Sequence, residues 1–307
     1  MSAEHKPDPQ GPVLHTRSNE HAPDSPTRSD EGLLDPSYQR RFGGLERLYG
    51  PDVLPRLAGA HMLVAGIGGV GTWSAEALAR SGVGRITLVD LDHIAESNIN
   101  RQLHALSDTL GQAKIDAMAQ RIAGINPQCR VRGIDDFVSP ENIASLLEDK
   151  PDVVIDCTDQ PAAKIAMILA GRQRGIPVLV CGGAGGKTDP LALRAGDLSM
   201  ANHDALLSRL RNRLRREHGY PKASTKAGKP VRRAPRMGVW ALWFEQPTVL
   251  PQQWTNNADS ADGLQGLSCA GYGSVVTVTA TMGMAAAGRA LDLLVANVPA
   301  GTAPSAK

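Results

Sequence analysis

The sequence predicts an α/β protein with a doubly wound, mostly parallel sheet. From His61 onward, short runs rich in β-branched residues alternate with amphipathic segments of helical length, which is the pattern of a parallel sheet covered by helices. The first of these runs leads directly into a glycine-rich turn, Gly66-Ile67-Gly68-Gly69-Val70-Gly71, and that turn opens a segment of helical period. With 307 residues, the chain is long enough to bury a sizeable core.

The hydrophobic pattern places the strands and helices in order along the chain. Strands are expected at residues 62–65, 85–89, 130–134, 153–155 and 178–180, and helices at 69–81, 112–125, 140–148 and 162–174. Gly82 and Gly175 follow two of these helices, as left-handed C-caps would, and Ser139 with Pro140 has the form of a helix first turn. Beyond Gly186 the pattern loosens into an expected basic helix at 201–217, a loop at 222–235, a strand at 239–244 and an apolar helix at about 274–295.

A single folded unit is expected between two polar ends. Residues 1–35 are rich in Pro, Ser, His, Asp and Glu and predict a disordered tail, and residues 297–307 predict a flexible one. Residues 36–296 would divide into a nucleotide-binding half, 36–186, and a substrate-facing half, 187–296. The four cysteines form no CxxC pair, which argues against a structural zinc site. A polar N-terminus without an apolar signal core favours a cytoplasmic protein.

Charge is distributed unevenly along the chain. The net charge is +2, yet residues 209–236 hold eleven Lys and Arg and one acid, Glu217, so the remainder is acidic. A basic element on an acidic body is typical of proteins that meet a polyanion. Residues 271–288 carry no charge and are long enough to raise the question of a membrane span. Their Thr, Gly and Ala content favours a buried core helix instead.

The glycine turn predicts a phosphate site. Gly66, Gly68, Gly69 and Gly71 allow a tight turn that brings backbone N–H groups to a phosphate at a helix N-terminus. Asp90 ends the next strand, 19 residues beyond Gly71, where its carboxylate can accept hydrogen bonds from ribose hydroxyls. These features fit NAD, FAD, S-adenosylmethionine and ATP equally well.

The residues that follow favour a triphosphate over a dinucleotide. After the acidic Asp90 and Asp92 come a dense polar cluster and, on the next helix, a lysine: Asn98, Asn100, Arg101, Gln102 and Lys114. A nucleotidyl transfer needs cations to neutralise the triphosphate and its transition state, whereas a dehydrogenase needs a slot for nicotinamide and a hydride path. Asp156 and Asp159, at the end of the fourth strand run, supply hard carboxylate oxygens that suit Mg²⁺ on the phosphates.

Each of these residues alone also has a structural explanation. Asp156 could cap a helix, Lys114 could be a solvated helix residue, and Asn98 and Asn100 could form turns. The whole set, arriving in order at strand ends, favours ATP binding. A nicotinamide dehydrogenase and a non-catalytic nucleotide-binding scaffold are the alternatives from other functional classes.

The combined motifs resemble the ubiquitin-activating-enzyme-like (ThiF-type) superfamily. Its marks here are GIGGVG, then LVDLD, then NxNRQ, then a lysine, then DCTD. A narrower set is similar to the family of tRNA threonylcarbamoyladenosine dehydratases: RFGGLERLYG at 41–50, NINRQLHAL at 98–106, INPQCRV at 125–131, GGAGGKTDP at 182–190 and LSCAGYGSVVTVTATMG at 267–283. The resemblance covers about residues 40–295 and implies a Rossmann-like ATP-binding fold.

The resemblance implies an ATP-dependent dehydration of N6-threonylcarbamoyladenosine beside the anticodon of tRNA. ATP would convert the carboxylate, a poor electrophile, into an acyl adenylate or acyl phosphate. Attack by the neighbouring carbamoyl group would then close a hydantoin or oxazolone ring, and alignment alone would suffice without an assigned general base. The alternative is an adenylyltransferase that activates the C-terminal glycine of a ubiquitin-like sulfur-carrier protein. Such activators commonly carry two CxxC pairs for zinc, which this sequence lacks.

Roles for nucleotide-binding residues follow from the same resemblance. Asp90 would hold the ribose, Arg101 and Lys114 the phosphates, and Asp156 the metal ion, while Asn98 and Gln102 would position the polyphosphate. The expected cofactors are ATP and Mg²⁺. The complete set of predicted nucleotide-binding residues is Gly66, Gly68, Gly69, Gly71, Asp90, Asp92, Asn98, Asn100, Gln102, Lys114 and Asp159. The predicted catalytic residues are Arg101, Lys114, Asp156 and Arg41.

The resemblance also implies partners. A homodimer is expected, in which Arg41 or Arg47 reaches the active site of the partner subunit, although either arginine could simply pack the first helix. Cys269 would be a small buried thiol or, alternatively, a nucleophile. A cysteine desulfurase or sulfur-acceptor system is a further expected partner. A peripheral or C-terminal membrane association is the alternative to a wholly cytoplasmic location.

The basic segment is expected to contact the tRNA backbone. Phosphates bind Lys and Arg without regard to sequence, and Tyr220 is the one aromatic residue within 209–236, so base stacking is poorly supported. The alternative is a solvated helix and loop. The expected tRNA contacts are Arg209, Arg211, Arg213, Arg215, Arg216, Lys222, Lys226, Lys229, Arg232, Arg233 and Arg236.

Overall fold

The computed structural model of the protein describes residues 16–17, 35–222, 225–226, 229–230, 235–249 and 272–295. Cys269 lies outside the described residues, as do the C-terminal tail and nearly all of the N-terminal one. The side chains of Lys226, Lys229, Arg232 and Arg233 are likewise outside them.

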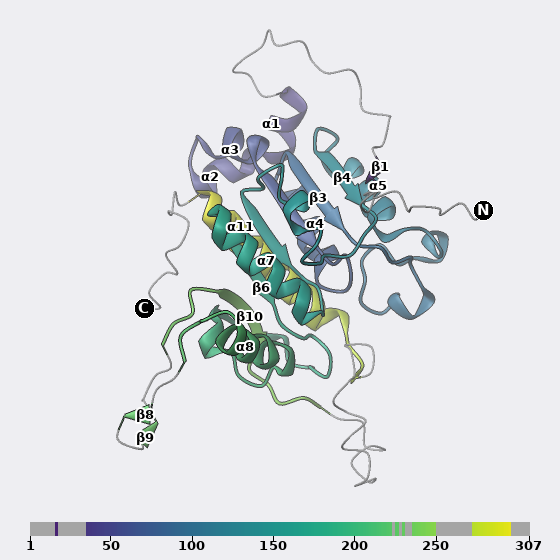
Figure 1. Cartoon of the computed structure of the whole chain (residues 1–307). Coiled ribbons are helices and arrows are strands. Elements are labelled where there is room, and N and C mark those ends of the chain that lie inside the picture. Colours follow the sequence, from purple (N-terminus) through teal and green to yellow (C-terminus); the bar gives the residue numbers. More distant parts are fainter. Residues whose placement is uncertain are drawn as a thin grey trace, which may run out of the picture.

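One eight-stranded sheet forms the centre of the protein (Figure 1), in the order β1-β4-β3-β2-β5-β6-β10-β7. From β4 to β10 neighbouring strands run parallel, and antiparallel strands β1 and β7 close the two edges. The strands are β1 (Thr16–Arg17), β2 (His61–Ala65), β3 (Arg85–Val89), β4 (Arg130–Ile134), β5 (Val153–Asp156), β6 (Val178–Cys181), β7 (Leu193–Asp197) and β10 (Trp240–Phe244). The chain proceeds from β2 to β3 and β4 on one side, then returns to the other side for β5 and β6. The doubly wound sheet is therefore confirmed, and its topological switch point lies between β2 and β5.

Helices cover both faces of the sheet (Figure 1), because the strand side chains alternate between two apolar layers. Met62 and Val64 of β2 face the core under α4 and α11, whereas Leu63 and Ala65 face the core under α7. The helices are α1 (Pro36–Phe42), α2 (Glu46–Tyr49), α3 (Val53–Gly59), α4 (Gly71–Arg80), α5 (Lys114–Ile125), α6 (Ile143–Leu146), α7 (Pro161–Arg174), α8 (Ala205–Glu217) and α11 (Val276–Val295). A third apolar cluster joins α8 to α7 and β10, so the segment after residue 187 extends the same sheet.

The structure differs from the expectations at four places. The expected helix 140–148 is a turn followed by the short α6, because the Ser139 hydroxyl accepts from Glu141 N and Asn142 N and stabilises a turn there. Strand β7 was not expected, since its Gly and Arg residues hide the period of an edge strand. Within the expected disordered tail, Thr16–Arg17 pairs with β4 as β1, and within the expected loop 222–235 a two-stranded ribbon forms from β8 (Thr225–Lys226) and β9 (Lys229–Pro230).

Helix α11 is long and apolar enough to cross a membrane by length and composition, properties that it shares with core helices of globular proteins. Its inward side chains, including Val278, Met282 and Ala286, are fully buried against α4 and the sheet. At Gly283 the two helices come so close that an added Cβ would lie 2.4 Å from the carbonyl oxygen of Val70. This packing is that of a core helix.

Candidate active site

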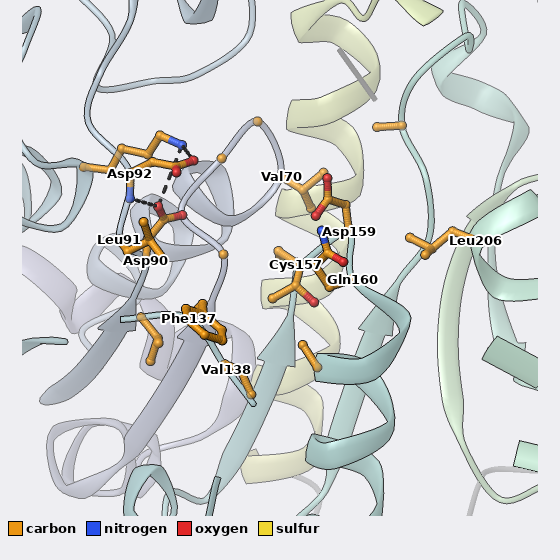
Figure 2. Close-up of a pocket in the computed structure, with 18 of the residues that line it drawn as sticks. Val70, Asp90, Leu91, Asp92, Phe137, Val138, Cys157, Asp159, Gln160 and Leu206 are labelled. Atoms are coloured by element: carbon orange, nitrogen blue, oxygen red, sulfur yellow. Dashed lines mark hydrogen bonds and ion pairs between the residues drawn. The ribbon is translucent and has the colours of Figure 1, made fainter. Parts of the chain in front are cut away.

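A cavity of about 800 Å³ opens at the carboxyl ends of the central strands, at the switch point of the sheet. Its lining comes from the glycine turn after β2, the end of β3, residues 98–102, the start of α5, the segment 136–141, and the loop between β5 and α7. In Figure 2, Asp90 and Asp92 lie on one side of the view, and Val70 of the glycine turn lies on the other side together with Cys157, Asp159 and Gln160.

The glycine turn has the close contacts that its sequence predicts. Gly66 has a φ of +84°, and a Cβ there would lie 2.9 Å from the backbone of Cys157. A Cβ on Gly71 would lie 1.8 Å from the carbonyl oxygen of Gly66, so only glycine fits the turn into α4. The backbone N–H of Ile67 donates to Asp90 Oδ2 at 2.6 Å, and this bond holds the turn against the end of β3.

A compact ionic cluster surrounds Asp90. Lys114 begins α5, is almost fully buried, and donates from Nζ to Asp92 Oδ2 at 2.6 Å; Asp90 Oδ1 lies 3.7 Å from the same nitrogen. Burial raises the pKa of the Asp90 carboxyl, and the Lys114 ammonium opposes that increase. Because the Asp92 side chain is 64% exposed, its contact with Lys114 is open to competition from an entering anion.

Arg101 packs against the glycine turn, where a Cβ on Gly69 would lie 3.3 Å from its Cγ. Its Nη1 donates to the carbonyl oxygen of Ser97 at 2.7 Å and to Asn100 Oδ1 at 2.9 Å. Asn100 also donates to the carbonyl oxygen of Ser274 at 2.7 Å, which ties this segment to the residues just before α11. Arg101 lines the cavity, and Asn100 orients it from outside the lining.

The side-chain amides of Asn98 and Gln102 differ in their hydrogen bonds. Asn98 Oδ1 accepts from the backbone N–H of Ala95, so part of its polar capacity caps a local turn. Gln102 is 7% exposed and lines the cavity, and its Oε1 has no hydrogen-bond partner among the described residues. A buried amide oxygen of this kind is costly unless a donor reaches it, so Gln102 is the amide best placed to contact a ligand.

The two aspartates after β5 occupy different environments. Asp156 is fully buried and paired with the equally buried Lys164, whose Nζ lies 3.1 Å from Asp156 Oδ1. Thr158 donates to the same oxygen from both its backbone N–H and its hydroxyl. Burial raises the pKa of the Asp156 carboxyl, opposed by Lys164. Asp156 does not line the cavity, whereas Asp159 does, so the geometry disfavours the expected metal role of Asp156 and favours Asp159.

Other predicted residues lie away from the cavity within this chain. Arg41, on α1, donates to the carbonyl oxygen of Ile125 at 3.1 Å and to the Ser37 hydroxyl one turn earlier in the same helix. On α8, Arg211 and Arg215 donate to backbone carbonyl oxygens, so they also fasten the helix and the turn after it. Arg213 pairs with Glu217 on the exposed side of α8.

The sequence alone gave no role to several residues at the site. His104 is 3% exposed, and its Nε2 lies 3.1 Å from the carbonyl oxygen of Ile67, directly behind the glycine turn. Burial lowers the pKa of His104 to about 4, so it is neutral at pH 7. Thr279 of α11 reaches the lining from a segment far away in sequence. Lys164 sits in an apolar helix and carried no sequence signal, whereas His104 lies inside the NINRQLHAL motif and could have been found there.

A doubly wound sheet whose glycine turn, acidic strand end and two cations converge on one cavity defines a nucleotide-binding α/β domain. The chain matches the ThiF family over residues 38–305 and belongs to it, and within that family it belongs to the tRNA threonylcarbamoyladenosine dehydratases.

Three comparisons with two relatives illustrate the match. The chain is 42% identical over 259 residues to the tRNA threonylcarbamoyladenosine dehydratase of Haemophilus influenzae, an alignment that covers 84% of this chain and 94% of the relative. The crystal structure of the Escherichia coli tRNA N6-threonylcarbamoyladenosine dehydratase in complex with AMP is 40% identical, with a TM-score of 0.74, and covers 86% of this chain and 98% of the other. The same enzyme in complex with ATP is 39% identical, with the same TM-score and coverage.

Proposed function

We propose that the protein catalyses the ATP-dependent dehydration of N6-threonylcarbamoyladenosine in tRNA to its cyclic form. The observation that carries the proposal is identity above 40% across nearly the whole of a dehydratase of that name, joined to a cavity that holds Lys114 and Arg101 beside an intact glycine turn. The E. coli relative is known in complexes with ATP and with AMP, which supports ATP as the co-substrate here. Family membership favours this reaction over adenylation of a sulfur-carrier protein.

The reaction needs activation of a carboxylate and then ring closure. A carboxylate oxygen of the threonyl group attacks a phosphorus of ATP, and the bond from that phosphorus to its leaving phosphate oxygen breaks, giving a mixed anhydride. The carbamoyl group then attacks the acyl carbon and gives up an N–H proton, and the phosphate departs with the former carboxylate oxygen. The net loss from the nucleoside is one water. Because both reacting groups belong to one side chain, holding them in alignment supplies much of the rate.

Lys114 and Arg101 are the groups best placed to neutralise the polyphosphate. Lys114 is held by Asp92 at the cavity wall, and an entering phosphate would exchange with the exposed Asp92 carboxylate for its Nζ. Asp90 keeps the glycine turn in place through Ile67 N, and its position at the end of β3 suits a ribose hydroxyl. Gln102 would supply an amide group to the bound nucleotide.

The carboxylates at the cavity can bind Mg²⁺ only together with the phosphates of the nucleotide. Among the parts of the chain that the structure describes, no cluster of three or more His, Cys, Asp or Glu could hold a metal ion alone. Asp159 provides one hard carboxylate on the cavity wall, and Mg²⁺ in nucleotide sites commonly binds one or two carboxylates together with substrate phosphates. Bound there, Mg²⁺ would supply charge neutralisation on the phosphates.

We further propose that the phosphate backbone of the tRNA contacts the exposed basic residues around α8. Arg216, Lys222 and Arg236 are exposed there, while Arg211 and Arg215 are half-buried. The homodimer, the action of Arg41 in a partner subunit, and a cysteine desulfurase or sulfur-acceptor partner stay predictions. Sedimentation of the purified protein and co-purification with a desulfurase would test them.

The reaction is tested by mass spectrometry of nucleosides from threonylcarbamoylated tRNA after incubation with the protein, ATP and Mg²⁺. We expect the modified adenosine to lose the mass of one water, and we expect no loss with the Lys114→Ala variant. Arg130→Ala, on the surface of β4 and outside the cavity lining, is the matched control and should leave the conversion intact. An unchanged nucleoside together with ATP turnover on a ubiquitin-like carrier protein would overturn the proposal in favour of carrier adenylation.

A further inference from the structure

Two thiols lie side by side beneath the nucleotide cavity, and the proposed reaction uses neither of them. Cys157 directly follows β5 and Cys181 ends β6, its parallel neighbour, and the two Sγ atoms are 3.9 Å apart. Cys157 is partly exposed and lines the cavity, whereas Cys181 is 1% exposed. We propose that Cys157 is a site of reversible oxidation by peroxides, reached through the nucleotide cavity and shielded by bound nucleotide, with Cys181 as its disulfide partner.

The two thiols have different surroundings, which determine which of them reacts first with the oxidant. Contact with the Cys157 thiol, together with burial, raises the pKa of Cys181, although the Lys164 ammonium opposes the increase. A buried and protonated thiol is a poor first nucleophile, so Cys157, the residue of the pair that lines the cavity, is expected to react first. Cys129 provides an internal reference, because burial raises its pKa to about 12 and it does not line the cavity.

The reaction balances with a peroxide as the oxidant. The Cys157 thiolate attacks one peroxide oxygen, the O–O bond breaks, and a sulfenic acid and hydroxide form; after protonation the hydroxide is water. The Cys181 sulfur then attacks the sulfenic sulfur, the S–OH bond breaks, and the departing hydroxide takes the Cys181 proton as a second water. Both sulfurs are oxidised by one electron each, and the peroxide is reduced by two. A thiol reductant reverses the change.

The strand geometry allows the disulfide with a small movement. A disulfide bond is about 2.05 Å long, so the sulfurs must approach by roughly 1.9 Å from their separation of 3.9 Å. Neighbouring residues on adjacent strands fall within the Cα separation that a disulfide spans. Cys157 is therefore expected to move toward β6 while Cys181 stays fixed in the core.

That movement would disturb the nucleotide site. The backbone of Cys157 packs directly on Gly66, where an added Cβ would be only 2.9 Å away, and Thr158 and Asp159 follow it in the chain. Drawing Cys157 toward β6 alters the support of the glycine turn and displaces the carboxylate proposed for Mg²⁺. Oxidation is therefore expected to weaken ATP binding, and bound ATP to slow oxidation. The shielding rests on the proposed function, whereas the thiol pairing does not.

The test treats the full-length protein with hydrogen peroxide, with and without ATP and Mg²⁺, and maps cysteine peptides by mass spectrometry. Without nucleotide we expect a Cys157–Cys181 disulfide and little change at Cys129. At an ATP concentration ten times its Kd, about one-eleventh of the sites are empty, so oxidation is expected to slow about tenfold. Cys181→Ala should instead leave a sulfenic acid at Cys157 that a cyclic dione captures, and Cys129→Ser is the matched control that should react as the original protein does.

Distinct results would separate the two parts of the inference. Oxidation of Cys157 no faster than that of Cys129, or its pairing with Cys269 instead of Cys181, would overturn the thiol site. A Cys157–Cys181 disulfide that forms equally fast while ATP is bound, as measured by equilibrium dialysis, would overturn the shielding. Failure of ATP to bind at all would count against the proposed function, and the disulfide map without nucleotide would still decide the thiol pair.

Discussion

Replacing Lys164 by Met would leave the Asp156 carboxylate without its cation inside the protein. Both side chains are 0% exposed, and Lys164 Nζ also donates to the carbonyl oxygen of Cys181 at 2.8 Å. Removing one partner of a buried ion pair costs about 3–5 kcal/mol, because the remaining charge is uncompensated. For a domain of this size, such a loss lowers Tm by on the order of 10 °C.

The double variant Lys164→Met/Asp156→Asn separates the charge from the packing. Asn retains an acceptor for the Thr158 N–H and hydroxyl that Asp156 holds now, and no buried charge remains. We expect it to recover about 1–3 kcal/mol of the loss in the single variant, measured as the free energy of unfolding in urea. A single variant that loses less than about 1 kcal/mol, or a double variant that loses as much as the sum of both single changes, would refute this account of the pair.

The pH dependence gives a second test of the same pair. Burial raises the folded-state pKa of Asp156, and Lys164 opposes this, so the Met variant should raise the pKa further. A carboxyl whose pKa is raised on folding contributes stability below its unfolded pKa of 3.8, and that contribution is lost as pH rises through the folded value. The stability difference between the Met variant and the original protein should therefore be largest at neutral pH and narrow as the pH falls toward 3.8. A difference independent of pH would contradict it.

Three further predictions follow from single contacts. Gly71→Ala places a Cβ 1.8 Å from the Gly66 carbonyl oxygen, so the turn must move. The affinity for ATP, measured by calorimetry, should then fall at least about tenfold, and an unchanged affinity would refute this prediction. His104 has a pKa of about 4 in the folded protein against 6.5 when unfolded, so its contribution to the protein's stability should be lost as pH falls from 6.5 toward 4. His104→Gln should therefore flatten that part of the profile of unfolding free energy against pH, and an unchanged slope would count against this account. Gly283→Ala should lower Tm because its Cβ would lie 2.4 Å from the carbonyl oxygen of Val70, the residue before α4. A Cβ on Gly288 meets nothing within 4 Å, so Gly288→Ala should instead gain up to about 1 kcal/mol of helix stability. Equal Tm values for the two variants would disprove the close crossing of α4 and α11.

The sequence predicted the fold well where each element carries its own signal. Strands β2, β3, β5 and β6 are mostly apolar runs bounded by glycine or polar residues, and Gly175 adopts the left-handed C-cap that its position predicted. Strand β7 and the shortened α6 were missed for opposite reasons. In β7, pairing with β10 outweighs a weak local pattern, and in α6 the side chains of Ser139 and Asn142 compete with the helix for backbone donors.

The site was predictable where residues follow one another closely after a strand, and less so where distant segments meet. The glycine turn, Asp90, Arg101 and Lys114 converge as their order suggests, because the carboxyl ends of parallel strands share one edge of the sheet. Thr279 could not be assigned in this way. Its position depends on the crossing of α4 and α11, and no local pattern specifies which side chains that crossing presents to the cavity.

Asp156 and Asp159 show how finely strand geometry decides between two residues of the same type. Asp156 is the last residue of β5, still paired in register with Ala65 and Val180, so its side chain is fixed inside the layer that α7 covers. There it acquires Lys164 and the two donors of Thr158, and it shapes the turn that follows. Asp159 comes three residues later, beyond the ladder and at the end of that turn, where its carboxylate faces the cavity. Asp156 therefore stabilises the turn that positions Asp159 at the cavity. The motif DCTD contains both aspartates, and the sequence alone does not reveal which of them is buried.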